Sequence, residues 1–282
     1  MTRRIAADGS TSGPGTWTAF RVPAGAISKA QGVAIASDAD GYEPSRVFVT
    51  ARFVSATGGV DIYTGAYDAS NGAVLWERTY NNASVNGYDY PVKITFANDW
   101  VYVAGVSAGG HPITGASTGP DYLVLRYRAS DGASIAPWGE FRYNNTGSDG
   151  SDVLTDMYVE GQTGDPQGGG QVPGGDYLYV TGWSFNATSK NDYLTARVSL
   201  ADPTQFVTIR SQPSAFPTSN DYATSLDYKA GTTYGRIFVT RYSNGNNGAN
   251  DDYWTISYPL DLSHEKGSIW YNGVGNGTDQ AV

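Results

Sequence analysis

The 282-residue chain contains no cysteine, only two histidines and only five glutamates. The absence of cysteine excludes disulfides, thiol nucleophiles and cysteine-based metal sites. His111 and His264 lie at unrelated positions in the chain, which argues against a histidine metal site and against a Ser-His-Asp triad. A chain without disulfides depends on the size of its core, and this length permits a large one.

Positive charge is also scarce. The 18 Lys and Arg stand against 27 Asp and Glu, which gives a net charge of −9 and a pI near 4.6. Proteins that bind nucleic acid or an anionic membrane surface present basic patches, so both partners are disfavoured. No apolar run approaches the roughly 20 residues of a membrane span, and we expect no membrane insertion. The basic residues at the start are not followed by the apolar stretch of a signal peptide, so the leader of an exported parent protein would lie outside this chain.

Helical periodicity is absent from every window, whereas glycine (36 of 282 residues) and polar turn residues are abundant. We therefore expect an all-β chain. A sequence motif that begins with Asp and continues with alternating residues recurs along the chain, starting at Asp61, Asp121, Asp192 and Asp252. The intervals are 60, 71 and 60 residues. The Gly-rich insertion at 161–175 accounts for the longer one, as expected of a loop inserted in a repeat.

Three further phrases recur around this one, each rich in β-branched and aromatic residues and bounded by turn residues. In the second unit they are 88–96, 99–107 and 136–144. Four short strands per repeated unit predict the blades of a β-propeller. The predicted blades span 29–82, 83–145, 146–214 and 215–275.

The two ends of the chain supply parts of a fifth unit. Residues 1–28 match a third and a fourth strand, and residues 276–282 match the beginning of a first strand. We therefore predict one β-propeller domain over 1–282, with five four-stranded blades of which the last is split between the N- and C-termini. A ring closed in this way has no exposed sheet edge between its blades. The second strand of this fifth blade has no counterpart in the sequence.

The repeat resembles that of the bacterial secreted β-propeller family (SBBP-type repeats). The matching residues are Asp-Tyr-Ala at 221–223, Val-Tyr-Val-Ala-Gly at 101–105 and Asp-Tyr-Leu-Thr-Ala-Arg at 192–197. The resemblance implies an exported or cell-surface repeat protein and carries over no catalytic residue. More distantly, the turn before Trp76 resembles the quinoprotein propeller repeat, in which the Trp docks one blade on the next. We expect Trp76 to pack between blades rather than to hold a cofactor.

Aspartate recurs at the start of the predicted first strands, as Asp89, Asp152, Asp221 and Asp279, with Ala30 at the equivalent place of the first blade. A charge repeated in each blade favours a structural role, such as bonding turn N–H groups or pairing with a neighbouring Arg; Arg126 and Arg197 share a strand register with their aspartates. Catalysis would instead need an acid and a base in unlike environments. The alternative is that these aspartates surround the propeller axis, where a glycosidase would place its carboxylates.

The segment 144–156 is a candidate cation loop, because Asp149, Ser151 and Asp152 lie close together among glycines. Ca²⁺ takes six to eight oxygen ligands, and this loop could supply several. The other interpretation is a polar turn. Ca²⁺ is thus the one cofactor that we consider at a named site.

The sequence therefore predicts a non-catalytic, exported or cell-surface β-propeller. We expect it to bind a protein or glycan partner, or to assemble with copies of itself through its terminal strands. The alternative is a carbohydrate-active hydrolase with axial carboxylates. A third hypothesis, a quinone-dependent dehydrogenase, is supported only by the motif of a turn followed by Trp76.

Overall fold

The structure is a computed structural model that describes residues 2–4, 16–19, 28–37, 44–54, 59–110, 117–145, 150–160, 177–187, 190–210, 220–229, 235–244 and 251–271. These residues form eighteen β-strands. No helix that could cross a membrane occurs among them.

Sixteen of the strands form four antiparallel sheets, each built from four consecutive strands, and we number these sheets blades 1 to 4. Blade 1 contains β3 (Ser28–Ser37), β4 (Pro44–Val54), β5 (Val60–Asp68) and β6 (Val74–Tyr80). Blade 2 contains β7 (Asp89–Ala97), β8 (Trp100–Gly110), β9 (Ser117–Arg128) and β10 (Glu140–Tyr143). Blade 3 contains β11 (Asp152–Val159), β12 (Tyr177–Asn186), β13 (Lys190–Ser199) and β14 (Phe206–Arg210). Blade 4 contains β15 (Asp221–Lys229), β16 (Arg236–Asn244), β17 (Asp251–Pro259) and β18 (Gly267–Tyr271).

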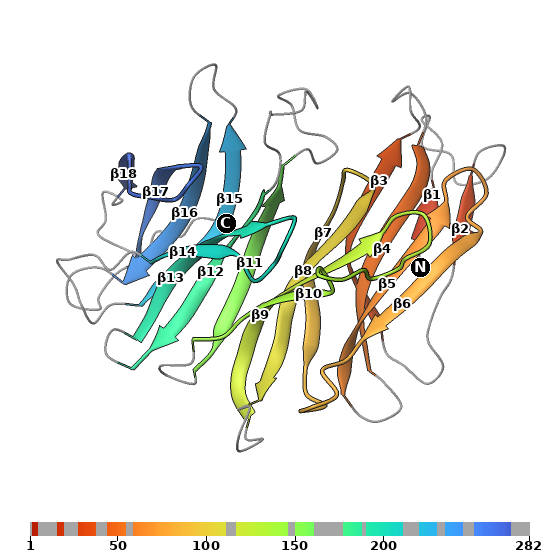
Figure 1. Ribbon diagram of the computed structural model, residues 1–282, viewed down its shortest axis with the longest axis horizontal. Helices are drawn as coiled ribbons and strands as arrows, with labels where there is room; N and C mark the ends of the chain where they lie inside the picture. Colours follow the sequence, from red (N-terminus) through yellow and green to blue (C-terminus); the bar gives the residue numbers. More distant parts are fainter. Residues whose placement is uncertain are drawn as a thin grey trace.

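The blades stack face to face in chain order (Figure 1). Their first strands lie against one another, β3 with β7, β7 with β11 and β11 with β15. Apolar side chains fill each joint. Phe48 and Ile62 pack with Ile94 between blades 1 and 2, and similar clusters join blades 2 and 3 and blades 3 and 4. Burying one such side chain contributes about 1.5–3 kcal/mol. The predicted all-β propeller architecture is thereby confirmed.

Two strands of the fifth unit are also present. β1 (Thr2–Arg4) pairs antiparallel with β2 (Trp17–Ala19), as expected for the third and fourth strands of a split blade. In Figure 1 this short pair lies at the end of the molecule next to blade 1. The strand predicted at 276–282 lies outside the described residues.

Each first strand carries one β-bulge at the same register. The extra residues are Gln31, Val92, Thr155 and Thr224. Aligning the blades on these bulges corrects one expectation. The residue of blade 1 that corresponds to Asp89 is Ser28, not Ala30, because Ser28 is the third residue before its bulge.

Tryptophan side chains tie each of the first two blades to the next one. Trp76 Nε1 donates to the Ala129 carbonyl in blade 2 at 2.9 Å, and Trp138 Nε1 donates to the Ser199 carbonyl in blade 3 at 2.9 Å. Gly132 is required beside Trp76, since a Cβ there would lie 2.7 Å from the indole ring. The predicted packing role of Trp76 is therefore confirmed.

Candidate functional site

Three of the four blades share an Asp–Ser–Asp row across their first three strands. In blade 2, Asp89 of β7 lies opposite Ser107 of β8, which lies opposite Asp121 of β9. The same row recurs in blades 3 and 4 as Asp152–Ser184–Asp192 and Asp221–Ser243–Asp252. Sequence reasoning found the aspartates but missed the serines. A serine follows the same Val-x-x-x pattern near the end of each second strand concerned, and that signal could have revealed them.

One expectation about these aspartates needs correction. The third-strand Asp does not open its strand in any blade. β5, β13 and β17 begin one or two residues before it, and β9 begins at Ser117, four residues before Asp121. Strand pairing extends through this segment, with Pro120 opposite Ala108.

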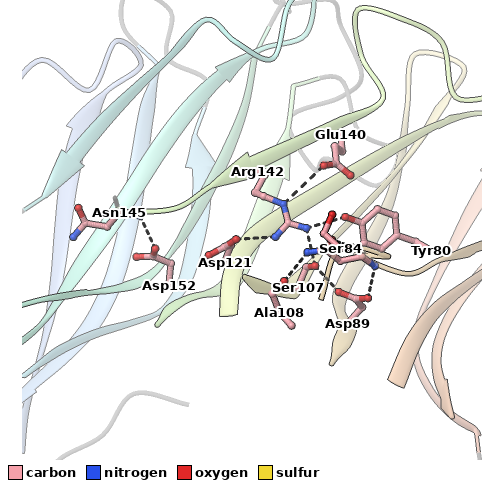
Figure 2. A network of polar contacts seen from close by, with 11 residues as sticks. Tyr80, Ser84, Asp89, Ser107, Ala108, Asp121, Glu140, Arg142, Asn145 and Asp152 are labelled. Carbon is pink, nitrogen blue, oxygen red and sulfur yellow. Dashed lines mark hydrogen bonds and ion pairs between the residues drawn. The ribbon is translucent and has the colours of Figure 1, made fainter. Parts of the chain in front are cut away.

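Asp89 is fully buried at the joint between blades 1 and 2. Its Oδ2 accepts a hydrogen bond from the backbone N–H of Asn82 at 2.8 Å, and its Oδ1 accepts one from Ser107 Oγ (Figure 2). Asn82 follows the last strand of blade 1, and its side-chain Nδ2 donates to the Ala108 carbonyl at 2.7 Å. The carboxylate thus anchors the segment that connects one blade to the next.

Arg142 extends this network (Figure 2). Its guanidinium lies 2.7 Å from Asp121 Oδ2 and also donates to Ser107 Oγ at 2.7 Å and to the Tyr80 hydroxyl at 2.9 Å. Glu140 lies at the outer side, 3.8 Å from Arg142 Nε. The positive charge of Arg142 therefore faces an otherwise acidic row.

Burial shifts the acid–base behaviour of two members of this network. It raises the pKa of Asp121 above the usual value, although the hydrogen bond and charge of Arg142 act in the opposite direction. Asp121 Oδ1 is buried, and no hydrogen-bond partner for it is found in the part of the chain that the structure describes. Burial likewise raises the pKa of Tyr80 to about 12, against the charge of Arg142.

The joint between blades 2 and 3 repeats the first. Asp152 is fully buried, and its Oδ2 accepts a hydrogen bond from the backbone N–H of Asn145 at 2.7 Å. Asn145 Nδ2 donates to the Phe185 carbonyl at 2.8 Å. Asn82 and Asn145 each precede their aspartate by seven residues. This spacing is a signal that the sequence carried and that the prediction did not use.

In blade 4 an arginine of the second strand contacts the first aspartate. Arg241 Nη1 lies 2.9 Å from Asp221 Oδ1, and the two side chains are 2% and 1% exposed. The guanidinium also lies 4.8 Å from the ring centroid of Tyr193 in blade 3 and 4.9 Å from that of Trp254. A buried pair is favourable only where its charges are compensated, and here the carboxylate and the two aromatic faces compensate the guanidinium. Arg241 Nε is buried and has no hydrogen-bond partner among the described residues.

The expected structural role of the aspartates is confirmed by their bonds to backbone N–H groups and to Arg142 and Arg241. Arg126 and Arg197, which share a strand register with their aspartates, instead bind carbonyl groups in the contacts that the structure shows. Arg126 Nη1 donates to the Leu200 carbonyl at 2.8 Å, and Arg197 Nη1 donates to the Leu260 carbonyl at 3.3 Å. Each acceptor lies in the turn between the third and fourth strands of the following blade. An arginine projecting from a third strand thus reaches forward to the next blade instead of along its own Asp–Ser–Asp row.

The candidate cation loop is only partly described. Asp149 and the predicted axial Asp279 lie outside the described residues. The backbone carbonyl of Ser151 accepts from the Phe185 N–H at 2.9 Å, and Asp152 binds Asn145 as above. No group of three or more His, Asp or Glu that could hold a metal ion occurs among the residues placed by the structure.

A second polar cluster lies along the first strands, immediately after the bulges, and sequence reasoning missed it. Lys93 Nζ of blade 2 lies 2.7 Å from Asp156 Oδ1 of blade 3. Asp156 Oδ2 accepts from Ser225 Oγ at 3.0 Å and from the Leu226 N–H at 2.8 Å, both in blade 4. The sequence could have indicated this cluster only through the shared position of the bulges, because the residues themselves differ from blade to blade. One carboxylate thereby connects three blades.

Comparison with known proteins adds little to what these contacts indicate about function. No protein-family model and no curated protein matches the chain. Among solved structures, a subtype N10 neuraminidase-like protein of A/little yellow-shouldered bat/Guatemala/060/2010 is similar over 76% of this chain and 61% of its own, at 7% identity and a TM-score of 0.34. The chain therefore spans less than two thirds of that protein. The major allergen Mala s 1 of Malassezia sympodialis is similar over 86% of this chain and 77% of its own, at 10% identity and a TM-score of 0.36. Likeness at this level transfers neither activity nor partner to this chain.

Proposed function

We propose that this chain is a non-catalytic β-propeller that acts as an exported or cell-surface binding or assembly module. The observation that carries the proposal is the use of the repeated aspartates. Asp89 and Asp152 are buried and bind the backbone N–H groups of Asn82 and Asn145, and Asp221 is paired with Arg241. A carboxylate that holds two blades together is not presented to a substrate, so these residues serve the scaffold.

The cluster on the first strands supports the same conclusion. Asp156 accepts from four donors, namely Lys93 Nζ, Ser225 Oγ and the N–H groups of Met157 and Leu226. A general base needs a lone pair directed at the substrate, and a carboxylate with four donors has none to spare. The resemblance to secreted propeller repeats supports an exported location, and the net charge of −9 favours a protein or glycan partner over nucleic acid.

One observation favours the alternative, a carbohydrate-active hydrolase. Asp89 and Asp121 flank Ser107 in one row, but their surroundings differ: Asp89 accepts from the Asn82 N–H, whereas Asp121 pairs with Arg142. Burial also raises the pKa of Asp121. Two carboxyl groups in unlike surroundings are what an acid and a base require.

The two functions differ in a direct assay. The purified chain would be incubated with a panel of polysaccharides and chromogenic glycosides, and also applied to immobilised glycans. The proposal predicts no release of reducing sugar, whatever the binding. We expect Asp89→Asn and Asp121→Asn to change only the unfolding temperature. Turnover by the wild-type chain that disappears in Asp121→Asn, while the fold is retained by circular dichroism, would overturn the proposal in favour of the hydrolase.

A further inference from the structure

The outer strands of the four blades differ in charge. β6, β10, β14 and β18 each lie at the end of their sheet and pair with one described neighbour. β6 contains Glu77 and Arg78, β10 contains Glu140 and Arg142, and β14 ends with Arg210. β18, with the sequence Gly-Ser-Ile-Trp-Tyr, contains no charged residue. Natural sheets block unwanted pairing at their edges with charged side chains. Within β18 there is none, and the nearest charged residues, Glu265 and Lys266, directly precede the strand.

β18 is also apolar and exposed. Ile269 is 73% exposed and Tyr271 is 47% exposed. Tyr271 stacks on Tyr253 of β17, with ring centroids 5.1 Å apart, so the strand is well supported from its inner side. Isoleucine, tryptophan and tyrosine favour extended pairing, and the strand contains no proline. In Figure 1, β18 is the outermost strand of blade 4, at the end of the molecule opposite β1 and β2.

We propose that β18 pairs antiparallel with β18 of a second copy of this chain. The inference gives a location to the assembly role proposed above and rests on it. A two-fold arrangement centred on Ile269 would place this side chain opposite its own copy, and Ser268 opposite Trp270. The same patch is then used on both partners, as in most homodimers.

The lack of charged residues in β18 favours a second copy of this chain as its partner. Each copy has a net charge of −9, so self-association needs a contact without charged side chains, and β18 is the outer strand that provides one. A basic peptide finds no acidic side chain on β18, whereas β6 and β10 each contain one beside an arginine. The interface is small, because five residues from each side bury well under the roughly 1,600 Å² of a standard complex. We therefore expect a weak dimer, with a dissociation constant on the order of 10–100 µM.

Salt provides the first test. Repulsion between the two acidic copies is screened as the Debye length falls from about 10 Å at 0.1 M salt to about 3 Å at 1 M, whereas the apolar contact persists. Sedimentation velocity over a wide range of protein concentration should show a dimer that becomes stronger with NaCl. A monomer under all these conditions, or a dimer that weakens with salt, would overturn the proposal.

Mutation locates the contact. Ile269→Lys places a charge on the edge and should abolish the dimer, whereas Val207→Lys, at the 42% exposed Val207 of β14, should not. Thermal unfolding would show that both variants are folded. An Ile269→Lys variant that dimerises as the wild type does would contradict the assignment to β18.

The absence of cysteine allows a second measurement that does not depend on losing the interface. Residues opposite each other in an antiparallel pair lie about 4.5–5.5 Å apart at Cα, within the range of a disulfide. Under mild oxidation, Ile269→Cys should form a covalent dimer well above the level of the control Val207→Cys. Equal cross-linking of the two variants would refute the two-fold pairing. These outcomes do not depend on the sugar-release assay, so a failure of the dimer and a failure of the non-catalytic proposal can be told apart.

Discussion

The first strands of blades 1 and 3 share a register, yet they differ sharply in burial. Val33 of β3 and Met157 of β11 each lie two residues after the bulge and opposite a valine of the second strand. Val33 is 60% exposed, whereas Met157 is fully buried against blade 2. The equivalent residues of blades 2 and 4, Ile94 and Leu226, are 6% and 5% exposed. In blades 2 to 4 this position is therefore covered by the preceding blade. Blade 1 also has an apolar residue there, Val33, although no complete blade precedes it among the described residues.

The Asp–Ser–Asp row follows the same division. Blades 2, 3 and 4 have the full row, whereas blade 1 has Ser28, Phe53 and Asp61 at the corresponding places and so keeps only the third-strand aspartate. The first aspartate is anchored by the preceding connection at Asp89 and Asp152. The difference teaches that the first aspartate belongs to the joint between two consecutive blades and not to a site repeated around an axis, whereas the third-strand aspartate is present in all four blades.

The largest effect is expected where the joint contains a buried ion pair. Arg241→Ala should lower the free energy of unfolding by about 3–5 kcal/mol, because the buried carboxylate of Asp221 would lose its cationic partner. Chemical denaturation measures this loss. Arg128→Ala, which removes the exposed pair with Asp131, is the matched control and should leave stability unchanged. Equal losses in the two variants would mean that Asp221 is not buried as described.

The comparison of Val33 with Met157 can be tested directly. Met157→Ala should cost about 2–5 kcal/mol, since it leaves a cavity between blades 2 and 3. Val33→Ala should change stability by no more than about 0.5 kcal/mol, as expected of an exposed position. A large loss from Val33→Ala would show that another part of the chain covers this strand in solution, as ring closure by the fifth blade requires.

Loss of the hydrogen bonds of Asp89 should cost less than loss of the buried ion pair. Asp89→Ala would leave the N–H of Asn82 without its acceptor and should lower the free energy of unfolding by about 2 kcal/mol. Asp227→Ala, at an exposed position of β15, serves as the control. If the two variants unfold at the same denaturant concentration, Asp89 does not hold the joint together.

A smaller effect concerns pH. Burial raises the pKa of Asp121 in the folded chain above its value in the unfolded chain. Between the two pKa values the folded chain holds a proton that the unfolded chain has released, so this group stabilises the fold at low pH. Its contribution is lost as the pH rises from about 4 through the raised pKa. The stability of the wild type relative to Asp121→Asn should therefore fall over this range in denaturation curves. A relative stability that rises over the same range would contradict the shift.

The smallest effect is expected from removal of divalent ions. Asp152 of the candidate cation loop already accepts from the N–H of Asn145, which competes with a metal for this carboxylate. We expect EDTA, and Ca²⁺ added afterwards, to leave the unfolding temperature unchanged. An increase of several degrees with Ca²⁺ would instead assign Asp149, Ser151 and Asp152 as ligands, because a metal that binds only the folded state raises its stability.

The sequence predicted the strands well because each has a strong local signal. Asp89, Asp152 and Asp221 open β7, β11 and β15 as expected, since turn residues precede them and alternating residues follow. The joints were harder to predict. The arginine partners of the aspartates depend on which side chains face one another across a joint, and neither Arg126 nor Arg197 met the aspartates.

The cluster of Lys93, Asp156 and Ser225 could not be foreseen at all from repetition, because it consists of residues that break the repeat. It depends on the bulges, which shift the alternation of each first strand by one residue. A bulge has no fixed composition here, as Gln31, Val92 and Thr155 show.

The ties made by Trp76, Arg126 and Arg197 all run forward, from one blade to the turn of the next. Each unit therefore encodes both the donor that reaches its successor and the turn that receives its predecessor. In genetic terms, a tandem duplication of one unit would copy half of each of two joints, so the forward ties could form between the new copies, although the contacts of Lys93, Asp156 and Ser225 would not be repeated. Gain or loss of a whole blade by recombination is thus the sequence change that this architecture tolerates best, whereas a break inside a unit separates the two halves of a joint.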